Sequence, residues 1–242
     1  MDKKADKQFP LSNRKNCAIY LNRIISSCER CMDRLKRYNE VSENILIKYA
    51  GREVVPIEVY SEMLDKTSSN ICYLLNLLGD SQKSSISYFK FRDYVLKHEI
   101  EGVVLDPLNN LVNDLLKDFN RMRNWQNHIP ESLLVAEMEQ VKVGKMQFSM
   151  DPVNIPIYKT VTYAYFKDMI DVNINFYNAA RKIIQAAKRD YKKIYGKSVT
   201  YNRVYTNRPL DFDKSIPTQK SAMLQGIKGN IGLDNNIEGE RL

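Results

Sequence analysis

Apolar residues recur at intervals of three and four positions through most of the chain, and few residues interrupt this pattern. Only nine glycines and eight prolines occur among 242 residues. This spacing is typical of helices with one apolar face, whereas strands alternate every second residue. The pattern therefore predicts an all-α fold, an antiparallel helical bundle of about six helices with a mobile C-terminal tail.

Capping residues and helix breakers give the expected boundaries. Gly51, Gly79 and Gly196 follow three of the apolar patterns, and Ser81 and the pair Asp106-Pro107 are candidate helix starts. Pro130 disfavours the α conformation at Ile129, so a helix should finish near position 127 or 128. We expect helices over about 13–49, 57–78, 82–98, 106–128, 130–143 and 158–195.

The expected helices divide the chain into three regions. Residues 1–12 form a flexible N-terminus, 13–196 a helical-bundle domain, and 197–242 a basic and aromatic segment followed by the mobile tail. The longest nearly apolar stretch, 71–78, is far shorter than a membrane span needs, and the charged start shows no export signal. We therefore expect a cytoplasmic protein with no membrane contact.

Positive charge is concentrated near both ends of the bundle. The formal net charge is +8; residues 1–37 carry ten basic and four acidic side chains, and 181–208 carry nine and one. If the fold brings these two segments together, their surface would attract a polyanion. The alternative is that these side chains only solvate two long helices.

The four cysteines give no metal or disulfide pattern. Cys17, Cys28 and Cys31 lie on the apolar side of the first expected helix, and Cys72 lies in the second. Unpaired cysteine is among the most buried residue types, so these positions indicate a reduced helix core. The sequence also lacks a phosphate-binding glycine loop and a His-Glu-x-x-His motif, so we expect no metal and no cofactor.

One short segment combines residues that could carry chemistry. Arg123-Asn-Trp-Gln-Asn-His128 contains one of only two histidines and lies at an expected helix end. Arg123 follows Phe119 by four residues, beside the apolar stripe, so its guanidinium needs a partner. Either a carboxylate pairs with Arg123 while His128 caps the helix, or the two bind an anion. Arg92 with His98, and Arg121 with His128, show similar spacing; the first pair converges only if its helix ends between them.

This segment resembles the R-x(4–6)-H motif of the HEPN superfamily, helical-bundle proteins that include many metal-independent ribonucleases. The resemblance implies an HEPN-like bundle in which Arg123, Asn124 and His128 are catalytic. It also implies a homodimer, in which a second copy supplies the other proton-transfer group. His128 would act as acid or base and Arg123 would bind the scissile phosphate. Cleavage by the 2′-OH would leave 2′,3′-cyclic phosphate and 5′-OH ends, in a defence, toxin or RNA-processing setting.

RNA is the polyanion that this resemblance favours. The candidate RNA-binding residues are Arg121, Trp125, Lys188, Arg189, Lys192, Lys193 and Arg203, with Tyr201 and Tyr205 as candidate stacking residues. For Trp125, packing against a neighbouring helix is the favoured alternative, since a lone tryptophan at a helix end more often packs than stacks on a base. The alternative function is a catalytically inactive HEPN-like adaptor or nucleic-acid-binding protein. An antitoxin or another regulatory protein is a further possible partner, although Pro130 replaces the tyrosine of one regulated toxin motif.

Overall fold

The computed structural model describes residues 9–83, 85–127, 131–144, 152 and 157–202. These ranges form a mostly helical fold, which confirms the all-α class, and a two-stranded antiparallel sheet. The elements are α1 (Arg14–Lys48), β1 (Val54–Pro56), α2 (Ile57–Gly79), α3 (Tyr88–Lys97), α4 (Asn110–Asn127), α5 (Glu131–Lys142), β2 (Thr160–Thr162) and α6 (Tyr163–Tyr195). The chain divides into two units, Met1–Val199 and Thr200–Leu242, and the elements all belong to the first. The expected mobile tail, together with Arg203 and Tyr205, lies outside the described residues.

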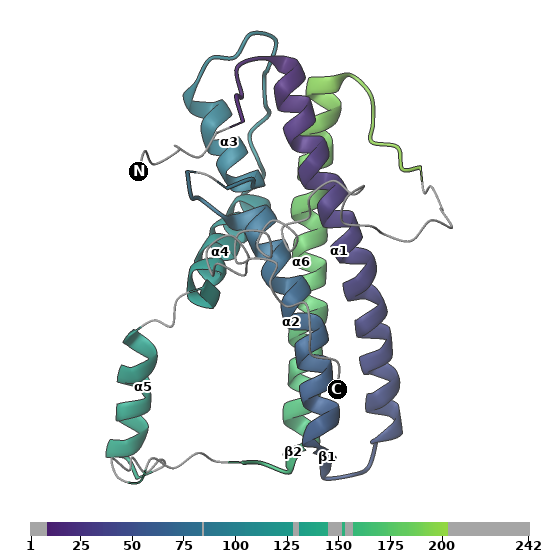
Figure 1. The fold of residues 1–242 in the computed structure, drawn as a ribbon, viewed down its shortest axis with the longest axis vertical. Helices are drawn as coiled ribbons and strands as arrows, with labels where there is room; N and C mark the ends of the chain where they lie inside the picture. Colours follow the sequence, from purple (N-terminus) through teal and green to yellow (C-terminus); the bar gives the residue numbers. More distant parts are fainter. Residues whose placement is uncertain (1–8, 84, 128–130, 145–151, 153–156, 203–242) are drawn as a thin grey trace, which may run out of the picture. The chain divides into compact units, whose positions relative to one another are not determined.

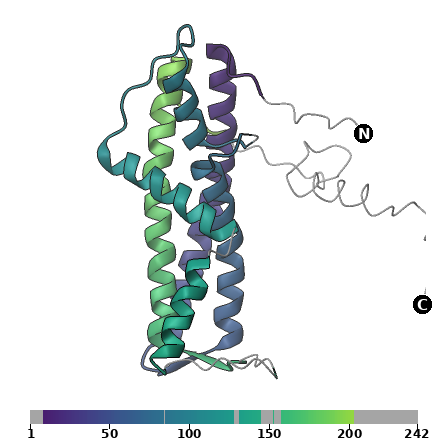
Figure 2. The ribbon, with the colours of Figure 1, turned by 90° about the vertical axis from the view of Figure 1, so that its left-hand side faces the viewer.

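The long helices α1, α2 and α6 lie side by side, and α4 runs obliquely against α2 and α6 (Figures 1 and 2). Helices α1 and α6 are antiparallel, because the side chain of Arg14 donates a hydrogen bond to the carbonyl of Ile194 and Lys188 pairs with Glu29 at 2.6 Å. Strand β1 connects α1 to α2, and strand β2 directly precedes α6. The two strands pair in antiparallel orientation. None of the helices among the described residues is both long and apolar enough to cross a bilayer.

Two apolar clusters form the core, and a layer of buried polar side chains lies between them. The larger cluster contains Leu35 and Leu74, and the smaller contains Met63 and Ile170. The layer consists of Asn39, Ser42, Thr67, Asn70 and Asn173, whose positions along α1, α2 and α6 fall between the clusters. Asn173 donates to the hydroxyl of Thr67 at 3.4 Å, which joins α6 to α2, whereas Ser42 and Asn70 donate to carbonyls of their own helices. The Asn173–Thr67 contact therefore favours one register of α6 on α2.

The cysteines of α1 occupy the larger cluster. Cys17, Cys28 and Cys31 are fully buried with free thiols, and Cys72 is half-buried. Burial raises the pKa of the Cys28 thiol well above its ordinary value of 9.0. A neutral, buried thiol is a packing group rather than a nucleophile, so the core interpretation of these positions holds.

Three helices begin later than the sequence predicts. Ser87, not Ser81, caps α3, and its hydroxyl accepts a hydrogen bond from the amide of Lys90 at 3.1 Å. Helix α4 begins at Asn110 rather than near Asp106, because Asn109 accepts from the amide of Val112 at 2.9 Å. Helix α6 begins at Tyr163, since the three residues before it pair as β2.

Asp106, which was expected to begin a helix and does not, has tertiary partners instead. The carbonyl of Asp106 accepts a hydrogen bond from Arg92 at 2.7 Å, and its carboxylate pairs with Lys193. Residues 80–87 form a connection in which the carboxylate of Asp80 accepts from the amide of Gln82 at 2.9 Å. At Asp106, long-range partners therefore override the local capping preference.

Candidate functional site

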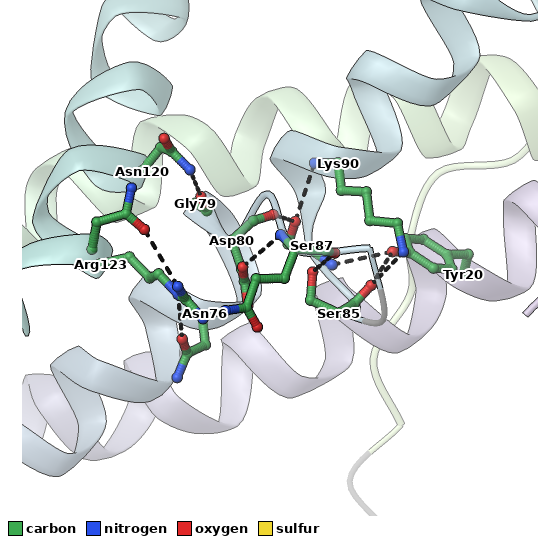
Figure 3. A network of polar contacts seen from close by, with 11 residues as sticks. Tyr20, Asn76, Gly79, Asp80, Ser85, Ser87, Lys90, Asn120 and Arg123 are labelled. Carbon is green, nitrogen blue, oxygen red and sulfur yellow. Dashed lines mark hydrogen bonds and ion pairs between the residues drawn. The ribbon is translucent and has the colours of Figure 1, made fainter. Parts of the chain in front are cut away.

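The site begins with the close approach of α2 and α4. A Cβ atom at Gly79 would lie 2.5 Å from the backbone carbonyl carbon of Phe119, so only glycine fits there. The side-chain amide of Asn120 donates to the carbonyl of Gly79 at 2.6 Å (Figure 3). Glycine at this position thus brings the middle of α4 against the end of α2. Helix α2 ends at Gly79, within one residue of the expected end, and the missing side chain also permits this contact.

Arg123 lies one turn further along α4 and is 8% exposed. Its guanidinium donates to three oxygens: Nε to Asn76 Oδ1 at 3.3 Å, Nη1 to Asn124 Oδ1 at 3.3 Å and Nη2 to Asp80 Oδ2 at 3.1 Å (Figure 3). We call Arg123, Asn76, Asp80 and Asn124 the Arg123 cluster. A carboxylate compensates the buried charge, and two neutral amides satisfy other donors of the guanidinium.

The connection after α2 holds the Asp80 carboxylate in place. One carboxylate oxygen accepts from Gln82 while the other binds Arg123, and the carbonyl of Asp80 accepts from the hydroxyl of Ser87. Tyr20 fixes the same connection from α1, since its hydroxyl accepts from the amide of Ser87 and donates to the carbonyl of Ser85, both at 3.2 Å. The anionic partner of Arg123 is therefore rigidly positioned.

The structure answers part of the question that the motif raised. Arg123 pairs with a carboxylate, which was one of the two alternatives, and Asn124 is exposed beside it. The described part of α4 ends at Asn127, so the helix break that the Pro130 argument predicts lies outside the described residues. His128 lies outside the described residues, so its geometry relative to Arg123 does not enter the description.

Two of the candidate RNA-binding residues are exposed on α4. Trp125 is 62% exposed, so it is not the packing residue that one interpretation expected. Arg121 is exposed and forms a surface ion pair with Asp118 at 2.9 Å. Both residues lie within one helical turn of Arg123, although Arg123 itself is buried.

The basic end of α6 lies beside the basic start of α1. Arg189 and Lys192 are exposed, whereas Lys188 and Lys193 bind the carboxylates of Glu29 and Asp106. The packing of α1 on α6 therefore brings together the two positively charged segments that the sequence identified. Arg203, the remaining candidate, is outside the described residues.

The rival pair does not converge. Arg92 is buried and binds Asp190 at 2.8 Å, whereas His98 is exposed and follows the last residue of α3. Because α3 continues to Lys97, the helix does not end between the two residues, which was the condition for them to meet. Arg92 and His98 therefore form no shared site.

Asp80 and Asn76 are the members of the site that sequence reasoning missed. Asn76 interrupts the apolar run Leu-Leu-Asn-Leu-Leu at the end of α2, and this polar residue was the signal that could have indicated a buried partner. Comparisons of the chain with family models, curated proteins and solved structures find no match. Among the described residues, no group of three His, Cys, Asp or Glu side chains could hold a metal ion.

Proposed function

We propose that the chain is a metal-independent endoribonuclease of the HEPN type. The observation that carries the proposal is the Arg123 cluster, a guanidinium held at the end of α4 just before His128. In this proposal the 2′-OH of RNA attacks the adjacent phosphate and leaves 2′,3′-cyclic phosphate and 5′-OH ends. Such a reaction requires a base, an acid and a cation that stabilises charge on phosphorus.

In the proposed dimer, two copies of the chain together supply these groups. His128 acts as acid or base, because the unperturbed pKa of histidine lies near neutrality. Arg123 binds the phosphate through its planar donor geometry, and Asn124 orients it. The second proton-transfer group comes from His128 of another copy across a two-fold axis.

Asp80 gives this proposal a specific requirement. The guanidinium already has an anionic partner 3.1 Å away, so a substrate phosphate must replace or share that partner. The oxygens of Asn76 and Asn124 keep their hydrogen bonds to Arg123 during this exchange. Substitution of Asp80 by asparagine should therefore strengthen RNA binding while leaving Arg123 hydrogen-bonded.

The second candidate is a helical adaptor that binds nucleic acid without cleaving it. The observation that favours it is the burial of Arg123, which is 8% exposed and paired with a carboxylate. A structural arginine has these properties, because the pair fastens α2 to α4. In this case the basic surface of α1 and α6 would bind nucleic acid, and the protein would not cleave RNA.

A cleavage assay separates the two candidates. Purified protein and its His128→Ala variant are incubated with end-labelled single-stranded RNA in EDTA, and the product ends are identified. The proposal expects cleavage by the parent alone, with cyclic phosphate termini; His98→Ala is the matched control and should cleave as the parent does. Equal cleavage by His128→Ala, or cleavage that appears only when Mg²⁺ replaces EDTA, would overturn the ribonuclease proposal. RNA binding without cleavage would support the adaptor instead.

A further inference from the structure

A groove lies between the first turns of α1 and the last turns of α6. Its volume is about 530 Å³, within the range of ligand pockets. Its walls include Arg14, Lys15, Ile19 and Asn22 from α1 and Tyr191 and Tyr195 from α6. This groove is separate from the Arg123 cluster, which involves α2 and α4.

The floor and walls of the groove offer apolar surface to a ligand. Ile19 is 48% exposed and Tyr195 is 55% exposed, although both lie on helices that pack together. The rings of Tyr191 and Tyr195 have centroids 5.3 Å apart, so the buried ring supports the exposed one. An aromatic face supported in this way can stack with an unpaired base, and the amide of Asn22 can donate and accept hydrogen bonds at a base edge.

Cations surround this apolar surface. Arg14 and Lys15 line the groove, and Lys192 lies three residues before Tyr195 on the same side of α6. Arg23 follows Ile19 by four residues and extends the charge along α1. In the described part of the chain, no carboxylate pairs with Lys15, Arg23 or Lys192, so these like charges repel one another unless an anion binds.

We propose that this groove binds one nucleotide of single-stranded RNA, with the base on Tyr195 and Ile19 and the flanking phosphates on Lys15 and Lys192. The combination of an exposed aromatic ring with unpaired cations is what single-stranded nucleic acid requires. The inference rests on the proposed function only in taking RNA as the polyanion. An anionic lipid could also use cations beside an apolar groove, and the experiment below distinguishes it.

The groove is displaced along α6 from the contact between α4 and α6. Phe176 of α6 stacks on Phe119 of α4 at 4.9 Å, one turn before Arg123. Tyr191 follows Phe176 by fifteen residues, which corresponds to about 22 Å along the axis of α6. The groove and the Arg123 cluster share no residue, so the groove would hold a nucleotide other than the one whose phosphate binds Arg123.

Binding is measured by fluorescence anisotropy with a short 2′-O-methyl RNA, which lacks the attacking hydroxyl and so cannot be consumed. Tyr195→Ala should weaken binding about 5- to 150-fold, whereas Tyr195→Phe should retain most of the affinity because the ring remains. Lys15→Gln and Lys192→Gln should each reduce the slope of log affinity against log salt by about 0.7. Tyr165→Ala and Lys167→Gln, exposed residues at the other end of α6, are the matched controls and should leave both quantities unchanged.

The outcomes separate this inference from the proposed function. If cleavage is absent but the groove variants weaken RNA binding, the groove inference stands and the ribonuclease proposal fails. Equal losses with the control variants, or undiminished binding by Tyr195→Ala, would overturn the groove inference. So would duplex DNA that competes as well as the RNA, or anionic phosphatidylserine vesicles that displace it, because neither presents an unpaired base.

Discussion

The described part of the bundle contains two buried arginine–aspartate pairs, and each arginine precedes a histidine by five or six residues. Arg92 binds Asp190 at 2.8 Å with both side chains at most 7% exposed. Arg123 binds Asp80 at 3.1 Å with side chains 9% and 7% exposed. The two pairs are alike in burial and charge, so neither property indicates which arginine serves a site.

The surroundings of Arg92 are those of a structural joint. Asp190 also accepts a hydrogen bond from the hydroxyl of Tyr88 at 2.7 Å, and Arg92 reaches the carbonyl of Asp106. His98 stacks on Tyr94 with ring centroids 4.1 Å apart, and its Nδ1 lies 2.9 Å from the carbonyl of the same residue. These contacts fasten α3 to α6 and leave His98 at a helix end.

The surroundings of Arg123 differ in the kind of group that binds the guanidinium. Two side-chain amides, Asn76 and Asn124, share it with Asp80, and α4 ends four residues later. An amide can rotate and offer either its oxygen or its nitrogen, whereas the phenol and backbone partners at the other pair have fixed roles. Side-chain amides beside the guanidinium therefore distinguish the candidate anion site at Arg123 from the structural contact at Arg92.

The largest expected difference between the two pairs is in catalysis. Loss of a general acid or base typically lowers the rate by about 10²- to 10⁴-fold, so His128→Ala should reduce RNA cleavage by that factor. His98→Ala should leave the rate unchanged, because the ring is exposed and stacks on Tyr94 of its own helix turn. Single-turnover cleavage rates measure both, and equal effects of the two variants would remove the distinction drawn here.

The next difference is in stability. Asp190→Asn should lower the free energy of unfolding by about 3–5 kcal/mol, because it leaves the buried charge of Arg92 uncompensated. Asp80→Asn should cost about 1.5–3 kcal/mol, since Asn76 and Asn124 still accept from Arg123. Urea unfolding of both variants tests the order. Asp118→Asn, which breaks an exposed pair with Arg121, is the control and should cost no more than about 1 kcal/mol.

A cost for Asp80→Asn equal to that for Asp190→Asn would mean that the amides do not support Arg123. Both arginine–aspartate pairs would then serve only to hold helices together, and this result would support the adaptor function. The order of the two costs therefore bears on function as well as stability.

Sequence reasoning predicted the long helices well because their apolar stripes are many residues long. The expected ends of α1, α2 and α6 lie within one residue of the observed ends, and Gly196 takes the left-handed conformation expected after a helix. It placed the starts of α3 and α4 too early, because Ser81 and Asp106 resemble caps locally. The Asp106 side chain instead binds Lys193, 87 residues away.

The sequence predicted that Arg123 needs a partner, but it did not predict which residue that partner is. The position of Arg123 beside an apolar stripe required a partner, and a carboxylate was one expectation. That this carboxylate belongs to Asp80, 43 residues earlier, depends on how α2 and α4 cross. The crossing in turn depends on Gly79, whose missing side chain has no periodic signature in the sequence. Contacts between residues so far apart in the sequence can be identified only from the three-dimensional structure.

A smaller effect is expected when the crossing itself is disturbed. Gly79→Ala should cost about 1–3 kcal/mol, because the added carbon collides with the backbone of Phe119 and α4 must shift. The shift should loosen Arg123 and leave Arg92 in place, which the exchange rates of the two Nε protons report by NMR. Gly51→Ala is the control: it has no nearby atoms, and its cost comes only from a φ of 80°. Unchanged exchange at Arg123 in Gly79→Ala would show that the crossing does not position this residue.

The smallest expected effect is a difference in alkaline stability. Burial, reinforced by the charge and hydrogen bond of Asp190, raises the pKa of Tyr88 well above its ordinary value of 10.0. Tyr20, on the Arg123 side, also has a raised pKa, chiefly through burial, but its hydrogen bond with Ser87 opposes the rise. A phenol that keeps its proton when folded and loses it when unfolded contributes stability below pH 10, and this contribution declines as the pH rises further.

The decline is at most about 1.4 kcal/mol per pH unit for each such group. Thermal unfolding between pH 9 and pH 11 should therefore show a shallower loss of stability in Tyr88→Phe than in the parent, with a smaller change in Tyr20→Phe. Each variant is compared with its own value at pH 8, because Tyr88→Phe also removes a donor to Asp190 at every pH. If Tyr20→Phe flattened the profile more, the buried phenol of the Arg123 side would be the more strongly coupled one. The prediction that Tyr88 is the more strongly shifted phenol would then be wrong.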